Sequence, residues 1–229
     1  QGTTSIIVQV PNNASSGFVS VVATNVCGNS PPSTLQVDVN SNGGVSAGID
    51  RIVCSGTASI DLAGAISGVI NNQNEWDWVV TTGTINTPNS LTSTYTLPPG
   101  FTSGNITIKI ISNQTTVDCP VVSDEMIITV LPTPTANISV TGANPICNGS
   151  TSNITFTATP NTTLTYTVSG VAGSSTINIG ASGTATLTTA ALTSNTIYTL
   201  TSVSYSSTPT CIQTVSETAT VTVNTAPTV

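Results

Sequence analysis

Charge is almost absent from the sequence. Its 229 residues include 9 Asp and Glu, 2 Lys and Arg and no His, so charged residues make up 5%, against about a quarter in a typical globular domain. The two basic residues, Arg51 and Lys109, cannot neutralise a nucleic-acid backbone or hold an anionic membrane surface. The composition therefore excludes nucleic-acid binding and an electrostatic membrane anchor.

Histidine and long apolar runs are absent as well. Without histidine, neither a Ser-His-Asp nor a Cys-His catalytic set can be built, and no CxxC pair offers a zinc site. No stretch approaches the roughly 18 apolar residues of a membrane-spanning helix. The sequence predicts a protein that is not an enzyme, holds no metal ion or other cofactor and does not insert into a membrane.

What the sequence does contain is the alternation of β-strands. Apolar residues make up 38%, and Val, Ile and Thr recur with a period of two in FVSVVAT (18–24), NITIKII (105–111) and ATVTVN (219–224). Gly, Pro and Asn interrupt these segments at short intervals, and we find no amphipathic helical pattern. The pattern predicts an all-β chain of sandwich domains.

An internal repeat divides the chain. VPNNASSGFVSVVATN (10–25) aligns with LPPGFTSGNITIKIIS (97–112), with a Ser-Gly pair and the alternating apolar positions in register. A third copy, at 188–203, carries Ser194-Asn195 in the Ser-Gly position. Asn often replaces Gly where φ is positive, so we expect Asn195 to adopt a positive φ.

The five cysteines occupy two positions of this repeat. Cys27, Cys119 and Cys211 each follow the repeated strand and precede a final strand, whereas Cys54 and Cys147 occur early in their repeats. The first repeat lacks its early half. We therefore expect the partner of Cys27 to lie upstream of residue 1.

The repeat predicts three consecutive parts. Residues 1–42 are expected to be the C-terminal part of one domain, and residues 43–132 and 133–229 to be two complete domains arranged end to end. The Pro-rich segment 131–137 is expected to be an extended, stiff linker. The expected strands are 45–53, 57–66, 75–82, 91–97, 104–112 and 124–130, then 135–141, 151–159, 162–168, 175–179, 183–189, 196–205 and 215–223.

Several segments resemble a known class of repeats. SAGIDRIVCSGTASIDLAG (46–64), EWDWVVTTGTI (75–85) and ICNGSTSNITFTATPNTTLTYTVSG (146–170) are similar to the polycystic-kidney-disease-like (PKD-like) and immunoglobulin-like repeats of Bacteroidota surface proteins. The last segment looks most like repeats of the giant gliding-motility adhesins exported by the type IX secretion system. The segment at 75–85 keeps the Trp-Asp start of a PKD-like repeat but lacks its Gly-Asp-Gly turn. The resemblance implies an extended, non-catalytic protein on the cell surface.

Two disulfide patterns are consistent with the cysteine positions. One joins the two cysteines within each domain, Cys54 to Cys119 and Cys147 to Cys211. The other joins Cys54 to Cys211 between domains. The loops after the first and the sixth strand of an antiparallel sandwich lie at opposite poles, too far apart for a bond that needs a Cα separation of about 4.4–6.8 Å, whereas the poles of stacked domains meet.

Trp76 and Trp78 lie two residues apart on an expected strand and therefore share a face. Tyr166 occupies the position of Trp78 in the next repeat, which favours a core role for Trp78. Trp76 has no such counterpart and is a candidate contact residue for a glycan.

The sequence thus favours a structural stalk segment of a long, repetitive adhesin or filament on the cell surface, whose partners are the neighbouring repeats of the same chain. A carbohydrate-binding module of a secreted protein, which contacts surface polysaccharide, is one alternative. A self-assembling extracellular fibre or sheath subunit is another, because low charge opposes association only weakly.

Overall fold

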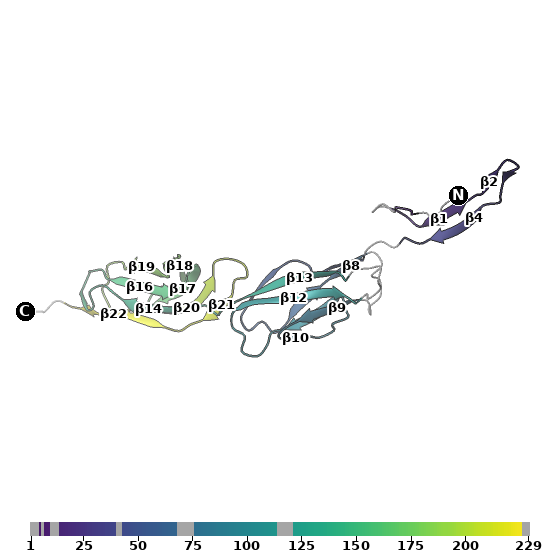
Figure 1. The fold of residues 1–229 in the computed structure, drawn as a ribbon. Helices are drawn as coiled ribbons and strands as arrows, with labels where there is room; N and C mark the ends of the chain where they lie inside the picture. Colours follow the sequence, from purple (N-terminus) through teal and green to yellow (C-terminus); the bar gives the residue numbers. More distant parts are fainter. Residues whose placement is uncertain are drawn as a thin grey trace, which may run out of the picture.

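The computed structural model describes residues 5, 7–9, 14–39, 43–67, 76–113 and 121–225. Every regular element in these ranges is a β-strand, which confirms the all-β prediction. Two sandwiches lie end to end, and a hairpin precedes them (Figure 1). None of the described residues forms a helix that is long and apolar enough to cross a membrane.

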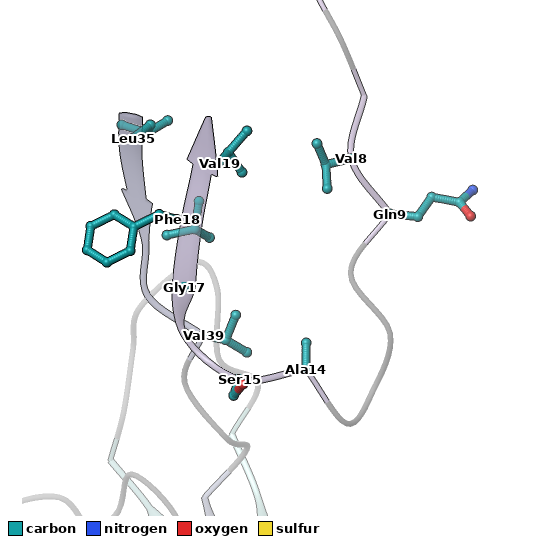
Figure 2. Close-up of a pocket in the computed structure, with 10 residues that line it drawn as sticks. Val8, Gln9, Ala14, Ser15, Gly17, Phe18, Val19, Leu35 and Val39 are labelled. Carbon is teal, nitrogen blue, oxygen red and sulfur yellow. The ribbon is translucent and has the colours of Figure 1, made fainter. Parts of the chain in front are cut away.

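The N-terminal hairpin is formed by β1 (Gly17–Val21) and β4 (Ser33–Val37), which pair antiparallel. The short strands β2 (Thr24–Asn25) and β3 (Gly28–Asn29) continue it to the turn that holds Cys27. One face of the hairpin is apolar and borders an open hollow of about 490 Å³ (Figure 2). Phe18 and Leu35 on this hairpin are 72% and 68% exposed.

In the residues that the structure describes, the middle sandwich has nine strands, most of them in two main sheets. They are β5 (Gly44–Ser46), β6 (Arg51–Cys54), β7 (Ile60–Ala63), β8 (Ala65–Ser67), β9 (Trp76–Val80), β10 (Thr84–Ile85), β11 (Thr92–Thr96), β12 (Gly104–Ser112) and β13 (Ser123–Leu131). One sheet has the order β6-β13-β12-β9 and the other the order β10-β11-β7, while β5 pairs with β8.

Alternation along β12 shows why the middle sandwich folds as it does. Ile106, Ile108 and Ile110 point inward and are at most 2% exposed, whereas Thr107 and Lys109 between them face outward or are partly buried. β12 lies between β13 and β9, so its inner face forms the centre of the core.

The last sandwich repeats this plan with ten strands. They are β14 (Ala136–Val140), β15 (Ile146–Cys147), β16 (Asn153–Ala158), β17 (Thr162–Val168), β18 (Ser175–Ile179), β19 (Thr184–Thr188), β20 (Thr196–Tyr205), β21 (Ile212–Thr214), β22 (Thr218–Val221) and β23 (Val223–Asn224). One sheet has the order β14-β16-β19, the other the order β18-β17-β20-β21, and β22 also pairs with β20.

Each sandwich has its own hydrophobic cluster. The cluster of the middle sandwich runs from Val45 to Val130 and includes Trp78. The cluster of the last sandwich runs from Ala136 to Val223 and includes Tyr166. The division of the chain at 42/43 and 132/133 is compatible with these clusters and stays a prediction.

The first strand of the middle sandwich differs from the single strand that the sequence predicted at 45–53. In the middle sandwich it is split into β5, antiparallel to β8, and β6, parallel to β13. Gly48, with a φ of +89°, lies between them. The last sandwich shows the same change of pairing. β14, which lies within the predicted strand 135–141, is antiparallel to β16, and β15, which the sequence did not predict, is parallel to β23. In each sandwich an antiparallel pairing is therefore followed by a parallel one.

The predicted alignment of the third repeat copy is wrong by one residue. Cys54 pairs with Leu131 and Cys147 pairs with Asn224, so these two pairs occupy the same place in their sandwiches. Three residues before Leu131, Ile128 pairs with Ile106, and three residues before Asn224, Val221 pairs with Thr196. Thr196 therefore corresponds to Ile106, and Asn195 lies one residue after the position that corresponds to Gly104. Asn195 does not adopt a positive φ. Its side-chain oxygen instead accepts a hydrogen bond of 2.8 Å from the Val223 amide, a role that glycine cannot perform.

Candidate functional site

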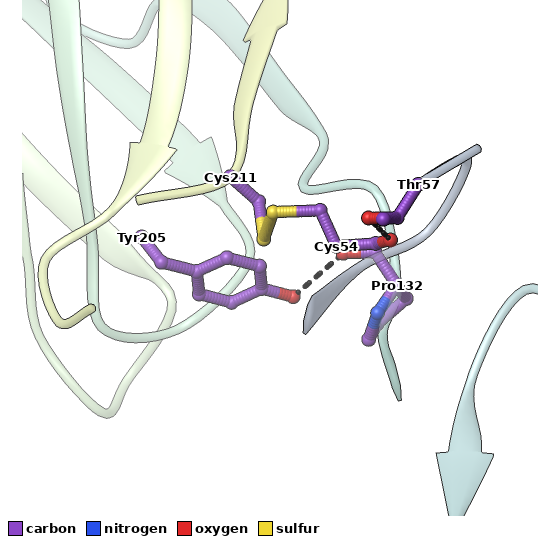
Figure 3. The surroundings of a disulfide bond; sticks show 5 residues. All are labelled: Cys54, Thr57, Pro132, Tyr205 and Cys211. Atoms are coloured by element: carbon purple, nitrogen blue, oxygen red, sulfur yellow. Dashed lines mark hydrogen bonds between the residues drawn. A yellow bond between two sulfur atoms is a disulfide. The ribbon is translucent and has the colours of Figure 1, made fainter. Parts of the chain in front are cut away.

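The joint between the two sandwiches is closed by a disulfide between Cys54 and Cys211, whose Cα atoms are 5.5 Å apart (Figure 3). Cys54 ends β6 and lies opposite Leu131 at the end of the middle sandwich. Cys211 lies in the loop between β20 and β21. The pairing between domains is confirmed, and the pairs Cys54–Cys119 and Cys147–Cys211 are wrong, because the two poles that meet here belong to different sandwiches.

A hydrogen bond across the same joint accompanies the disulfide. The Tyr205 hydroxyl donates to the carbonyl oxygen of Pro132 at 3.0 Å (Figure 3). The Tyr205 amide also bonds to the carbonyl of Cys211, at 3.3 Å. The linker, the disulfide and the tyrosine therefore connect the sandwiches at three places. The Pro-rich linker was predicted from the sequence, whereas no residue pattern pointed to Tyr205.

A tight turn holds Cys54 in place. The amide of Thr57 donates to the carbonyl of Cys54 at 3.1 Å, and the amide of Ser55 donates to the carbonyl of Leu131 at 2.8 Å. Gly56 has a φ of +82°, a region that favours glycine. The turn ties Cys54 to the last strand of its own sandwich, so the disulfide is anchored in the fold.

The remaining cysteines have different outcomes. Cys27 and Cys147 are exposed and form no disulfide in the described part of the chain. Cys119 lies outside the described residues. The prediction that the partner of Cys27 precedes residue 1 is not tested.

The predicted glycan contact at Trp76 is wrong. Trp76 and Trp78 share the inner face of β9 and are 1% and 3% exposed, so neither indole can stack on a sugar. Trp78 lies opposite Ile110, and the residue that corresponds to Trp76 in the last sandwich is Leu164, which is fully buried. Trp76 is a core residue that packs where an aliphatic side chain packs in the neighbouring repeat.

Among the residues that the structure describes, no group of three His, Cys, Asp or Glu side chains is placed to hold a metal ion. One acid with a clear structural role is Asp124, whose carboxylate accepts hydrogen bonds from the Ala47 amide at 2.8 Å and the Ser46 hydroxyl at 3.3 Å. The Ala47 amide is the main reason that the pKa of Asp124 lies below its ordinary value. Asp124 thus ties the first strand to β13.

The outer face of the sheet β14-β16-β19 carries uncharged hydrogen-bonding side chains, which we call the hydroxyl face. The Thr155 hydroxyl lies 2.8 Å from that of Thr141 and 3.4 Å from that of Thr186. All the members except Thr155 are exposed. The members are Asn137, Ser139, Thr141, Asn153, Thr155, Thr157, Thr184, Thr186 and Thr188.

The hollow at the N-terminal hairpin has the register of a sandwich core. Val19 pairs with Leu35 two positions after the Gly17 pair, just as Ile106 pairs with Ile128 two positions after the Gly104 pair. In the middle sandwich these positions are buried. The apolar hollow is therefore typical of one half of a core rather than of a small-molecule site.

Comparison with known proteins gives a fold but no family. No protein-family model matches the chain, and no curated protein matches it. Among solved structures, a segment of titin is 11% identical with a TM-score of 0.52, covering 93% of this chain and 76% of the titin chain. The Escherichia coli adhesin FdeC is 14% identical with a TM-score of 0.48, covering 91% of this chain and 74% of the FdeC chain.

The chain has tandem immunoglobulin-like sandwiches. This fold rests on the strand order of the two sheets and on the likeness to titin over nearly the whole chain. It confirms the predicted fold class. Because the identity is low, the likeness extends to the fold alone.

Proposed function

We propose that this chain is a non-catalytic stalk segment of a long, repetitive adhesin on the cell surface. Its function is mechanical: it spans distance and resists extension while another part of the protein makes contact. The observation that carries the proposal is the disulfide between Cys54 and Cys211 at an end-to-end joint.

The disulfide changes how the chain would carry tension. A pull on the two ends passes along the chain to Cys54, crosses the sulfur–sulfur bond and continues from Cys211. The 157-residue separation between the two cysteines includes most strands of both sandwiches. Those strands are bypassed, so even complete unfolding of them adds no length to the segment.

The N-terminal hairpin supports a continuing array. We propose that residues 1–42 form the last strands of a further sandwich, since β1 and β4 repeat the register of β12 and β13 and present an apolar face. The partner of that face would be a sheet of the same kind as β10-β11-β7. Neighbouring repeats of the same chain are then the main partners of this segment.

The biological setting is proposed from the sequence resemblance. Immunoglobulin-like repeats with spaced cysteines and few charges resemble those of Bacteroidota gliding-motility adhesins, which use type IX secretion. An extracellular location also suits a protein with a disulfide, since such bonds persist in oxidising compartments.

Single-molecule stretching of the chain tests the proposal. The intact chain should extend only through residues outside the segment 54–211. Reduction should release roughly 510–560 Å of additional length, at about 3.3–3.6 Å per residue over the 157-residue separation. The double variant Cys54→Ser, Cys211→Ser should show the long extension without reductant, and Cys27→Ser should behave like the unmodified chain. An intact chain that shows the full extension without reductant would reject the mechanical role.

A second candidate function, lateral association into a fibre, is favoured by the hydroxyl face. This face lacks charge, and the whole region from residue 133 to 229 contains a single acidic residue, Glu217. Little electrostatic repulsion would oppose packing of two such faces. Sedimentation over a range of concentrations distinguishes the two: a fibre subunit assembles, and the variant Thr155→Lys, Thr186→Lys stops it, whereas a stalk segment remains monomeric.

A further inference from the structure

The turn at Cys147 reproduces the turn at Cys54. The amide of Ser150 donates to the carbonyl of Cys147 at 3.0 Å, as Thr57 donates to Cys54 at 3.1 Å. Gly149 has a φ of +80°, and the corresponding φ at the first joint is +82°. Cys147 is therefore held by its own sandwich in the conformation in which Cys54 forms its bond.

The position of the two turns in the fold is also the same. Cys147 lies opposite Asn224 in a parallel pair, as Cys54 lies opposite Leu131. The Asn148 amide donates to the carbonyl of Asn224 at 3.1 Å, which matches the bond from Ser55 to Leu131. Cys147 is thus at the pole that the last sandwich turns away from the observed joint.

The residue after this strand completes the correspondence. Thr225 follows Asn224 as Pro132 follows Leu131, and the Pro132 carbonyl accepts the tyrosine hydroxyl at the first joint. Thr225 and Cys147 are both exposed. The far pole of the last sandwich therefore presents a free thiol and an exposed Thr225 at the two positions, Cys54 and Pro132, that bond across the first joint.

We propose that this pole forms one half of a second disulfide-bonded joint between sandwiches. The other half is another immunoglobulin-like sandwich with a cysteine in the position of Cys211. Formation of the bond removes one proton from each thiol and joins the two sulfurs, and the two electrons reduce a small-molecule disulfide to two thiols. The inference deepens the proposed function and rests on it, because it assumes that the sandwiches continue end to end.

The experiment extends the chain by one sandwich. A second copy of residues 133–229 that carries Cys147→Ser is fused directly after Thr225, so that the original Cys147 is the one at this position and the added Cys211 is placed as the original Cys211 is placed after Pro132. The protein is oxidised with oxidised glutathione and mapped by nonreducing peptide analysis. We expect Cys147 joined to the added Cys211, Cys54 joined to the original Cys211, and complete loss of alkylation at Cys147, which the chain without the extra sandwich retains.

A matched variant tests the geometry of the turn. In the extended chain, Cys147→Ser combined with Asn148→Cys moves the thiol by one residue, and the bond to the added sandwich should be lost. A bond formed equally well from residue 148 would show chance proximity and overturn the proposal.

A second extension keeps the test decisive if the first added copy does not fold. It carries residues 43–132 after Thr225, with Cys119 at the matching repeat position. If Cys147 can still be alkylated in both extended chains while Cys54 is bonded to Cys211, this inference is overturned and the stalk proposal stands. A map in which Cys54 and Cys211 are not joined overturns both.

Discussion

The two sandwiches share their core strands but send one strand to opposite sheets. In the middle sandwich, β10 pairs with β11. In the last sandwich, β18 occupies the corresponding place in chain order and pairs with β17. The middle sandwich therefore has the four-stranded sheet β6-β13-β12-β9, which ends at β9. In the last sandwich the strand equivalent to β9 is β17, and β18 is added beside it.

The difference lies in how the edge of one strand is covered. In the middle sandwich, the backbone amide of Trp78 donates to the Pro88 carbonyl at 2.8 Å, and its indole donates to the Ser90 carbonyl at 2.9 Å. In the last sandwich, the edge of β17 is covered by the β18 ladder from Thr162–Ile179 to Tyr166–Ser175. An exposed strand edge needs hydrogen-bond partners, and a loop and a strand both supply them.

Equivalent core positions should give the largest effects. Trp76→Ala should lower the free energy of unfolding of the middle sandwich by about 3–5 kcal/mol, and Leu164→Ala that of the last sandwich by about 2–5 kcal/mol, because each leaves a cavity. Denaturant titration measures both. Fluorescence of Trp78 follows the middle sandwich, since both tryptophans lie there. The tyrosine signal follows mainly the last sandwich, which holds three of the four tyrosines.

The control for this pair is Val79→Ala, on the outer face of β9 and 48% exposed. It should change stability by less than about 1 kcal/mol. A Trp76→Ala chain as stable as this control would show that Trp76 does not contribute to the core.

Substitution of two glycines that follow the corresponding strands β9 and β17 should destabilise the two sandwiches to different extents. Gly83 and Gly170 have φ values of +78° and +79°. A Cβ at Gly83 would lie 2.6 Å from the Thr96 carbonyl and against the Tyr95 hydroxyl, whereas a Cβ at Gly170 meets nothing within 4 Å. Gly170→Ala should cost about 1–2 kcal/mol for the backbone alone, and Gly83→Ala about 1–3 kcal/mol more from overpacking.

Thermal unfolding of the two glycine variants checks this order. Similar losses of stability would mean that Gly83 is not confined by Tyr95 and Thr96. A larger loss at Gly170 would reverse the comparison.

Acid should destabilise only the middle sandwich. The Ala47 amide holds the pKa of Asp124 below its ordinary value of 3.8, so the ionised carboxylate stabilises the fold above that value. This contribution is lost as pH falls from about 3.8 through the lower folded pKa. Unfolding followed by tryptophan fluorescence should shift over this range, and Asp124→Ala should remove the shift, whereas Asp77→Asn should leave it in place.

The smallest effect should come from the ion pair on the outer face of the middle sandwich, which has no counterpart in the last. Lys109 and Glu125 lie 3.1 Å apart with side chains 38% and 54% exposed. Lys109→Ala should change stability by less than about 1 kcal/mol, and added salt should reduce the difference further. A salt-independent loss above this size would indicate a role in packing.

Local residue patterns were enough to predict the strands of the core. NITIKII is an alternating segment, and its isoleucines became the buried face of β12 because a period of two places every second side chain on one side. The repeated cysteine positions suggested a pairing within each domain, and the chain direction of a sandwich suggested the pairing between domains, which is the one observed.

Local residue patterns did not predict which distant segments pack against each strand. Alternation defines two faces of β9, but the exposure of Trp76 depends on the strands that pack against it, which lie far away in sequence. The sheet that receives β10 or β18 depends on which edge needs a partner. The contact from Tyr205 to Pro132 depends on the meeting of two poles.

An all-β chain of repeats with few charges and with cysteines at two repeated positions follows from the sequence alone, because residue type and period are enough to define these properties. The bond from Cys54 to Cys211 across a joint and the burial of Trp76 were established by the three-dimensional structure. Both depend on distances between segments that are remote along the chain, and the local pattern of residues does not specify such distances.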